Sequence, residues 1–357
     1  ERVRVGEITL TFAELPTFVR DVYIEKDVLS PGRLFVSFKT ALSSLNYLGT
    51  VIGSQFFFLE DIIALYLYIA KQRAEAFLGT ELTRIVLGRP VRFAFKPEDD
   101  RLAAERLLKA AFRAGYEEVY LQYEPIAAAY QYESTIDHEQ NVLIFDFGGG
   151  TLDLSIARLG DPRTRAVLAN GGVPIAGDIF DQKLARARLP QHFGEGSFYR
   201  SGDKRMPVPG SFYEAFSNWQ ELLSLQKSET LEHIGRIERA AERPHQIRAL
   251  RSLISSSYSL RMYDIVENAK RQLSERTRAE IDLEGPGFNV YEPVHRRDFE
   301  AIIHPEFTTI EQYLDSLIAD AGLTPDDIDV VIRTGGSSQI PVFVKMLQQR
   351  FGEGKVR

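Results

Sequence analysis

The hydrophobic positions between residues 59 and 160 alternate between a helical and a strand period. A helical stripe is formed first by Leu59, Ile62, Ile63, Tyr66, Ile69 and Phe77. This spacing of three and four residues predicts an amphipathic helix that buries one face. The runs "RIVLGRPVRF" (84–93), "EEVYLQYE" (117–124) and "NVLIFDF" (141–147) are short and rich in branched or aromatic residues, which predicts strands.

Two helices are predicted between these strands. The first spans about 97–115, because Pro97 suits a first helical turn, acids follow it, and Gly115 can end the helix. The second begins at Pro125 in "PIAAAYQYE". Helices that alternate with strands indicate an α/β architecture.

Residues 184–300 have a different pattern. The stretch 193–212 is rich in glycine, serine and proline, which predicts a loop, and long polar helices follow it. We therefore expect a helical insertion. The run "GRIERAAERPHQIRALR" (235–251) carries arginines beside Glu238 and Glu242, which predicts a solvated helix face rather than a binding patch.

The composition of the chain excludes several classes of partner and chemistry. The chain has 357 residues, of which 44% are hydrophobic and 26% charged, a net charge of −7 and no cysteine. The negative charge argues against a nucleic-acid partner. The lack of cysteine excludes disulfides and thiol chemistry and fits a reducing, cytoplasmic setting. The longest apolar run, 62–70, is bounded by Glu60, Asp61 and Lys71 and is too short to span a membrane.

Three consecutive glycines, Gly148, Gly149 and Gly150, are the first candidate site. The residues after them alternate between apolar and polar, so the glycines lie in a turn between two strands. This excludes the Walker and dinucleotide-binding motifs, which run from a strand into a helix. Backbone amides without side chains beside them can approach an anion closely and form a phosphate-binding turn.

Polar residues flank this turn. Asp146 precedes it and Asp153 follows it, so the two carboxylates are placed to hold a hydrated Mg²⁺ beside a phosphate. Thr151 adds a hydroxyl donor. The alternative is a tight hairpin with two solvent-facing aspartates and no ligand.

Two further segments are candidate nucleotide contacts. In "VVIRTGGSSQIP" (330–341) a strand ends at Gly335 and Gly336, where a flat ring or a ribose can rest on the backbone before a helix opens; a simple helix-capping turn is the alternative. In "SLRMYDIVENAKRQLSE" (259–275), where surface ion pairs are the alternative, one helical face is formed by Glu267, Lys270, Arg271 and Ser274.

The order of these segments resembles the nucleotide-binding domain of the 70-kDa heat-shock chaperone (DnaK-type) family, in the actin-like ATPase superfamily. "LIFDFGGGTLDLSI" is similar to its second phosphate motif, "RTGGSSQIP" to its adenosine motif and "ENAKRQLS" to its adenosine-contacting helix. "YEPIAAAYQYE" resembles its connecting segment, "IAGDIFD" (175–181) its acidic turn, and "LFVSFKTAL" (34–42) the segment with its catalytic lysine. The chain is most similar to short, divergent bacterial members without a peptide-binding domain.

The resemblance implies roles in phosphate and metal binding. Asp146 and Asp153 are implied to hold Mg²⁺ through water, and Asp153 also to order the attacking water. Lys39 is placed at the γ-phosphate, and Glu124 links the metal shell to movement between lobes. The residues implied to cradle the β- and γ-phosphates are Gly148, Gly149, Gly150 and Thr151.

The resemblance also implies contacts to the nucleoside. Gly177 lies where the family's acidic turn approaches the nucleotide. One side of the adenosine is implied to contact Glu267, Lys270, Arg271 and Ser274. The other side is implied to contact Gly335, Gly336, Ser337 and Gln339.

The sequence departs from the family pattern at two points. The first phosphate motif, Asp-x-Gly-Thr after an N-terminal strand, is expected in the first few dozen residues, where strand-like Val3 and Val5 precede Gly6 without it. Because the chain begins at Glu1 rather than methionine and stops abruptly at "GEGKVR", we expect a longer protein that carries the motif; the alternative is a degenerate site that lacks it. Gln339 stands where many members have an arginine that packs on adenine.

The resemblance implies a bilobed α/β fold of the actin-like ATPase (ribonuclease H-like) type, with two lobes around a nucleotide cleft. Lobe I is expected to span 1–138 and lobe II 139–330, with the helical insertion at about 184–300 in lobe II. The C-terminal segment 331–357 is expected to return to lobe I. The protein is expected to be a monomer.

The expected activity is Mg²⁺-dependent binding and slow hydrolysis of ATP to ADP, as a chaperone-type conformational switch. Expected partners are the nucleotide and, by resemblance only, co-chaperones or a protein client, but neither nucleic acid nor membrane. One alternative is a nucleotide-binding protein with little or no hydrolysis, either a sensor or an actin-like filament former. The other is a phosphotransferase of the sugar kinase type, which would share the glycine turn but not "ENAKRQLS".

Overall fold

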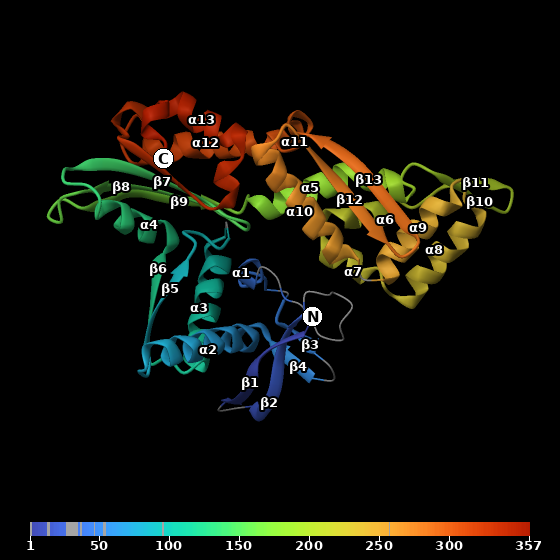
Figure 1. Cartoon of the computed structure of the whole chain (residues 1–357), viewed down its shortest axis with the longest axis horizontal. Coiled ribbons are helices and arrows are strands. Elements are labelled where there is room, and N and C mark those ends of the chain that lie inside the picture. The colour runs from blue at the N-terminus through green and yellow to red at the C-terminus, as the bar shows by residue number, and fades with distance from the viewer. Residues whose placement is uncertain are drawn as a thin grey trace.

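The computed structural model describes residues 2–12, 15–25, 35, 38–45, 47–52, 55–94, 96–256 and 258–357. It has a mixed α/β structure in which helices pack on a four-stranded sheet and on several two-stranded sheets (Figure 1). The predicted α/β class is therefore confirmed. Within these ranges, no helix combines the length and the apolar character needed to cross a membrane.

The four-stranded sheet carries the glycine turn. Its strand order is β14-β7-β8-β9, in which β7, β8 and β9 are antiparallel neighbours and β14 runs parallel to β7. The glycines join β7 to β8, so the predicted hairpin is confirmed. The bounds are β7 (Gln140–Phe147), β8 (Leu152–Leu159), β9 (Ala166–Val173) and β14 (Val330–Thr334).

Both faces of β7 are buried because its apolar side chains alternate between two cores. Leu143, Phe145 and Phe147 belong to the larger core with helices α12 and α13, whereas Val142 and Ile144 pack with α4 on the other face (Figure 1). Fully burying an apolar side chain of this size stabilises the fold by about 1.5–3 kcal/mol. The end of the hairpin is thus attached to a rigid layer. The helices are α4 (Glu124–Glu133), α12 (His304–Asp320) and α13 (Pro341–Phe351).

The C-terminal segment joins the four-stranded sheet through β14. Strand β14 pairs with β7 and places Thr334 opposite Asp146, and the expected return of 331–357 to lobe I stays a prediction. Val331 is fully buried, and α13 shares its core with β7.

Helices α2 and α3 pack on each other beside the parallel strands β5 and β6. The predicted helix over 97–115 is confirmed, and Gly115 follows it with a φ of 86°. The predicted stripe of α2 is only partly correct, because Tyr66 and Phe77 are 66% and 89% exposed. The buried side instead repeats every four residues from Leu59 to Leu67. The bounds are α2 (Leu59–Leu78), α3 (Pro97–Arg113), β5 (Arg84–Arg89) and β6 (Glu118–Tyr123).

The first residues form two hairpins and a short helix. The strand predicted at Val3 and Val5 is confirmed as part of β1. Of the predicted lysine segment 34–42, residues 34, 36 and 37 lie outside the described residues, whereas Lys39 lies in α1. The bounds are β1 (Arg2–Phe12), β2 (Leu15–Glu25), α1 (Phe38–Ala41), β3 (Gly49–Ile52) and β4 (Gln55–Phe58).

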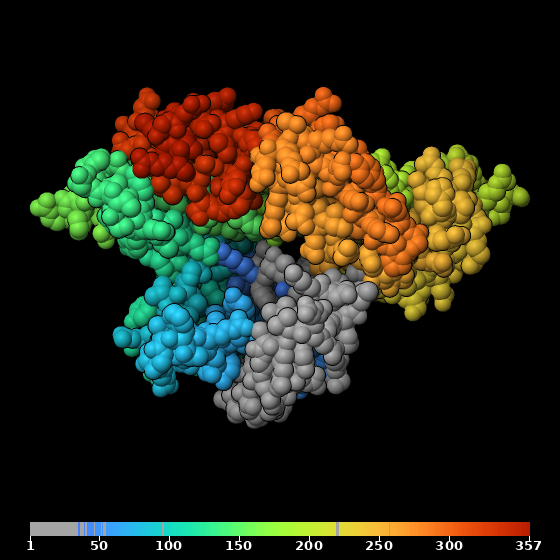
Figure 2. All heavy atoms as spheres, viewed as in Figure 1, coloured from blue at the N-terminus to red at the C-terminus, as the bar shows by residue number. Residues whose placement is uncertain are grey.

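The region predicted as a helical insertion also contains two β-hairpins. One of them, β10–β11, lies within the loop predicted at 193–212, and β12–β13 follows α10. The hydrophobic core runs without interruption from the sheet into α8, α9 and α10, and this region extends to one end of the molecule (yellow to orange in Figure 2).

The helices here are α5 (Gly177–Arg188), α6 (Ser211–Glu214), α7 (Trp219–Ser224), α8 (Ser228–Ala240), α9 (Pro244–Ser255), α10 (Ser259–Glu275) and α11 (Arg296–Ile302). The strands are β10 (Phe198–Ser201), β11 (Lys204–Pro207), β12 (Arg278–Gly285) and β13 (Phe288–His295). Short 3₁₀ turns are η1 (Pro190–Phe193), η2 (Ala215–Ser217), η3 (Pro325–Asp327), η4 (Gly336–Gln339) and η5 (Glu353–Lys355).

Candidate functional site

The glycine turn is held in place through its carbonyl groups. The Gly148 carbonyl accepts hydrogen bonds from the Gly177 amide at 3.2 Å and from the Ser337 hydroxyl at 2.7 Å. The Gly149 carbonyl accepts one from the Asp178 amide at 2.8 Å. Two segments that are distant in sequence therefore fix the orientation of these peptide groups.

The amides of the same turn remain available. The Gly148 amide donates to the Thr151 carbonyl, but the amides of Gly149 and Gly150 donate to no group in the described part of the chain. Gly149 is exposed and Gly150 is half-buried. Successive amides without protein acceptors form a concavity that attracts an anion, so the turn has the donors that a phosphate requires.

Asp146 and Asp153 are directly opposite each other on β7 and β8. Opposed residues of neighbouring strands point to the same face of the sheet, so the two carboxylates are close together. Burial, together with the Asp153 and Glu124 carboxylates, raises the pKa of Asp146 to about 6. Asp146 accepts no hydrogen bond from the described residues, which leaves its oxygens available to water or a cation.

Asp153 is 1% exposed and is held by the protein on both oxygens. The Val91 amide donates to Oδ1 at 2.6 Å and the Thr151 hydroxyl to Oδ2 at 2.7 Å. Burial raises the pKa of Asp153 in spite of these hydrogen bonds. The alternative of two solvent-facing aspartates is therefore wrong for Asp153, and the Thr151 hydroxyl, predicted to face a phosphate, donates to Asp153 here.

Lys39 and Glu124 form an ion pair that joins α1 to the start of α4. The Lys39 Nζ lies 2.7 Å from Oε1 and 2.6 Å from Oε2 of Glu124. Lys39 lowers the pKa of Asp146, whereas Glu124 raises it, so these groups interact electrostatically. Because Lys39 faces three carboxylates (Glu124, Asp146 and Asp153), the cluster has excess negative charge and favours a cation.

Gly177 is the residue at which the remaining predicted segments meet. A Cβ atom added there would lie 2.8 Å from the Ser337 Oγ, 3.0 Å from the Lys270 Nζ and 3.4 Å from the Gly148 carbonyl oxygen. Only glycine allows such a close approach of three segments. The glycine turn, the acidic turn, α10 and the adenosine-motif segment are thus assembled at one place.

Lys270 is buried in an ion pair. Its Nζ donates to the Asp181 Oδ2 at 2.6 Å and to the Gly177 carbonyl at 3.0 Å. Burial raises the pKa of Asp181 to about 7, although the Lys270 ammonium opposes this change. Asp178 and Asp181 were not among the predicted site residues, and the signal that identifies them is the pair of acids in "GDIFD" directly after Gly177.

Two exposed residues of α10 form a surface ion pair, which is the alternative interpretation of this helix face. Arg271 pairs with Glu267 at 2.6 Å, with side chains 70% and 41% exposed. Ser274 is half-buried, and its carbonyl accepts a hydrogen bond from Arg296 at 3.4 Å. Of the four predicted residues on this helix face, only Lys270 bonds to Gly177, the residue that packs on the glycine turn.

Gly335 packs against the strand that enters the glycine turn. Its φ is 82°, and an added Cβ would lie 2.3 Å from the Phe147 carbonyl oxygen. Both the backbone conformation and the contact therefore require glycine. Gly336 and Gln339 are exposed, whereas Ser337 is buried. A simple capping turn does not account for the Ser337 hydrogen bond to the glycine turn.

No group of three or more histidine, aspartate or glutamate side chains that can hold a metal occurs among the described residues. Mg²⁺ usually keeps several water ligands and binds through one or two carboxylates plus substrate phosphates. Asp146, with its available oxygens, fits such a site.

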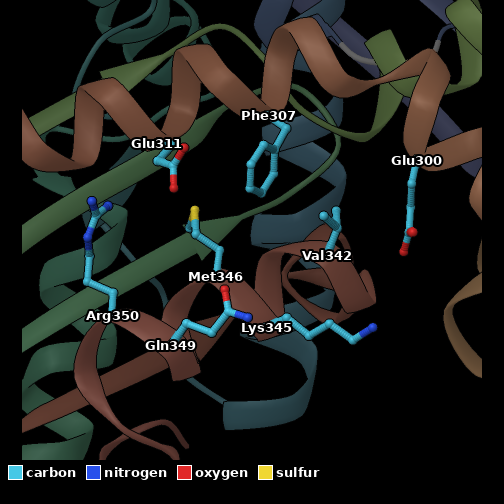
Figure 3. A pocket seen from close by; sticks show the side chains of 8 residues that line it. All are labelled: Glu300, Phe307, Glu311, Val342, Lys345, Met346, Gln349 and Arg350. Carbon is cyan, nitrogen blue, oxygen red and sulfur yellow. The ribbon is translucent and has the colours of Figure 1, made fainter.

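One surface groove lies away from these residues. It has a volume of about 470 Å³ and lies between α11, α12 and α13, with Phe307 and Met346 facing each other inside it (Figure 3). No predicted site residue lines it. The glycine turn has backbone amides that can bind a phosphate and lies among the predicted residues, so it is the candidate site. The groove is lined by Glu300, Phe307, Glu311, Val342, Lys345, Met346, Gln349 and Arg350.

A comparison with protein families gives a match over most of the chain. The family model described as Hsp70 protein matches residues 38–199 and 249–357. Every predicted site residue lies in the matched ranges. The unmatched residues 200–248 include the whole of α8.

Proposed function

Because this chain belongs to the Hsp70 protein family, we propose that it binds ATP with Mg²⁺ at the glycine turn and hydrolyses it slowly as a conformational switch. The family supports a nucleotide-binding, chaperone-type function, and its members are generally ATPases. The observation that carries the proposal is the pair of amides at Gly149 and Gly150, which have no acceptor among the described residues and lie beside the available carboxylate of Asp146.

The turn is organised before a ligand binds. Its carbonyls are already bonded to Gly177, Asp178 and Ser337, so the amides need no rearrangement to meet the β- and γ-phosphates. Donors that are fixed in advance stabilise developing charge without a cost in reorganisation. The same arrangement brings Gly335 and α10 to the turn, on the two sides proposed for the adenosine.

Asp146 would hold the hydrated Mg²⁺. When bound, the metal supplies positive charge to the phosphate oxygens. Lys39 would exchange Glu124 for the γ-phosphate, since both are anions and the ion pair is only partly buried. Glu124 would then be free to accept a hydrogen bond from water in the site.

Asp153 would orient the attacking water. Each of its oxygens accepts one hydrogen bond from the protein, at 2.6 and 2.7 Å, and retains a lone pair. Phosphoryl transfer depends mainly on positioning this water and on neutralising charge. A carboxylate held by Val91 and Thr151 is well suited to the first task.

The proposed switch requires two bodies on either side of the nucleotide. Lys39 lies in α1 and the glycine turn lies in the β7–β8 hairpin, so one ATP would contact both elements. A ligand that contacts both bodies favours their closed arrangement, and loss of the γ-phosphate removes part of that preference. This is how the predicted bilobed fold would convert hydrolysis into movement.

The test is phosphate release from Mg²⁺-ATP by wild type and by Asp153→Asn, with ATP binding measured for both. The asparagine keeps an acceptor for the Val91 amide. We expect release to fall by roughly a hundredfold while binding changes little. Equal release rates well above background would remove Asp153 from the mechanism.

A nucleotide sensor is the second candidate. It is favoured by the lack of Asp-x-Gly-Thr in the sequence, which leaves one phosphate motif without a counterpart. ATP binding without measurable release by the wild type would establish it.

A further inference from the structure

A second groove lies between α8, α9 and the turn that joins β12 to β13. Its volume is about 820 Å³. Helices α8 and α9 lie side by side at the end of the molecule, next to the tip of the β12–β13 hairpin (Figures 1 and 2). The groove is lined by Leu231, Glu232, Gly235, Arg236, Arg239, Arg248, Arg251, Ser252, Ser255, Pro286 and Gly287.

Arginines from both helices line this groove. Arg248 and Arg251 contact the two oxygens of the largely buried Glu238, at 2.9 and 3.1 Å. Arg236 and Arg239 on α8 are exposed, and neither contacts a carboxylate among the described residues.

The charge of the groove opposes that of the chain. Four arginines against Glu232 and Glu238 leave an excess of two positive charges, on a chain with a net charge of −7. The interpretation of 235–251 as a merely solvated helix face is therefore incomplete. The fold places arginines from two helices around one concave surface, and a one-helix pattern does not reveal this.

The shape of the groove depends on α8. Gly235 is buried and lies beneath the Arg251 guanidinium, where an added Cβ would be 3.5 Å from Nη1. Ile234 and Ile237 anchor the opposite side of α8 in the core. Arg236 and Arg239 are consequently fixed on the outer side of a packed helix.

We propose that this groove binds an acidic segment of a partner protein, whose carboxylates pair with Arg236 and Arg239. Arginine binds carboxylates through two parallel hydrogen bonds, which gives geometric selectivity. Leu231 and Pro286 add a small apolar surface for neighbouring side chains of the segment. Helix α8 lies outside the residues that the family model matches. The proposal does not depend on nucleotide binding.

The lining favours a peptide over nucleic acid. Proteins that bind single strands stack the bases on aromatic side chains, and none of the lining residues is aromatic. A volume of about 820 Å³ holds a few side chains, whereas a duplex needs a broad basic surface. An acidic peptide satisfies the positive charge within the available space.

The test uses a short fluorescein-labelled peptide of alternating glutamate and leucine, titrated with the whole chain and followed by anisotropy. We expect the double variant Arg236→Gln/Arg239→Gln to bind roughly tenfold more weakly than wild type. Arg243→Gln is the matched control, because Arg243 is exposed on the same segment but does not line the groove. Raising the salt concentration should weaken wild-type binding.

Four results would overturn the proposal. The first is an absence of peptide binding by the wild type, and the second is an unchanged affinity of the double variant. The third is an equal loss in Arg243→Gln, which would indicate general charge attraction. The fourth is equally tight, arginine-dependent binding of a single-stranded oligonucleotide, which would make the groove a polyanion site. Wild-type ATP affinity in the double variant would show that the nucleotide site is intact.

Discussion

Ser337 donates a 2.7 Å hydrogen bond to the carbonyl oxygen of Gly148, although 189 residues separate them along the chain. The bond joins two segments that the sequence marks only as separate glycine-containing turns. It occupies the carbonyl side of the glycine turn and leaves the following amides to a ligand. The phosphate and nucleoside sides of the proposed site are therefore one structural unit.

The first prediction concerns this bond. In Ser337→Ala the Gly148 carbonyl keeps only the Gly177 amide, so the free energy of unfolding should fall by about 1 kcal/mol. ATP affinity should fall several-fold because the turn is less fixed. Urea unfolding and calorimetric titration measure these changes. Ser316→Ala is the control, since Ser316 is exposed and its hydroxyl bonds to the Gln312 carbonyl within α12. A variant at Ser337 that behaves like this control would contradict the prediction.

The second prediction concerns Asp146. Its pKa of about 6 exceeds the usual 3.8, so the folded state binds more protons than the unfolded state between these values. Stability without ligand therefore falls as pH rises through this window. Asp146→Asn should remove that fall and raise the free energy of unfolding at pH 7.5 by about 1 kcal/mol, after allowance for solvent screening.

The same variant should lose the dependence of ATP affinity on Mg²⁺. In the wild type, the increase in ATP affinity that Mg²⁺ causes should become smaller below about pH 6, where Asp146 becomes protonated. Thermal unfolding from pH 4 to 8 and ATP titrations with and without Mg²⁺ measure both effects. An unchanged Mg²⁺ dependence in Asp146→Asn would place the metal elsewhere.

The third prediction concerns the Lys270–Asp181 pair. Lys270→Met leaves the Asp181 carboxylate buried without its cation, which should cost about 3–5 kcal/mol above pH 7. The pKa of Asp181 is already raised to about 7, so at pH 5 the carboxyl is protonated and the cost should be much smaller. Urea unfolding at both pH values measures this difference. Lys270→Met/Asp181→Asn should recover most of the loss, and a loss that does not vary with pH would argue against this account.

The fourth prediction concerns Lys39. Its ion pair with Glu124 has side chains 38% and 33% exposed, so Lys39→Met should change the free energy of unfolding by less than about 1 kcal/mol. Phosphate release should nevertheless fall by roughly a hundredfold, because the charge at the γ-phosphate is lost. Single-turnover phosphate release measures this effect. Wild-type release in Lys39→Met would show that the ion pair is only structural.

The sequence predicted the parts of the site that depend on local pattern. The alternation after Gly150 identified the β7–β8 hairpin, and the flanking acids identified Asp146 and Asp153. Gly335 was found as a residue at the end of a strand, and its positive φ agrees with that position.

The remaining features depend on contacts between distant segments. The pairing of Lys270 with Asp181 joins residues that are 89 positions apart, and helical spacing cannot reveal it. The same limit explains why Phe77, which is 89% exposed, was placed on a buried stripe. A helix has a buried side only relative to the elements that pack on it, and for α2 that element is α3.

The central claim is that the amides at 148–150 bind the phosphates of ATP, and titration calorimetry of Mg²⁺-ATP with Gly149→Val tests it most directly. A side chain there fills the space before the amides and approaches the Asp178 Oδ1 at 3.0 Å. Gly210→Val is the control, because an added Cβ there meets nothing within 4 Å. We predict at least about a tenfold loss of affinity, or 1.4 kcal/mol, for Gly149→Val alone. Wild-type affinity in Gly149→Val would contradict the claim.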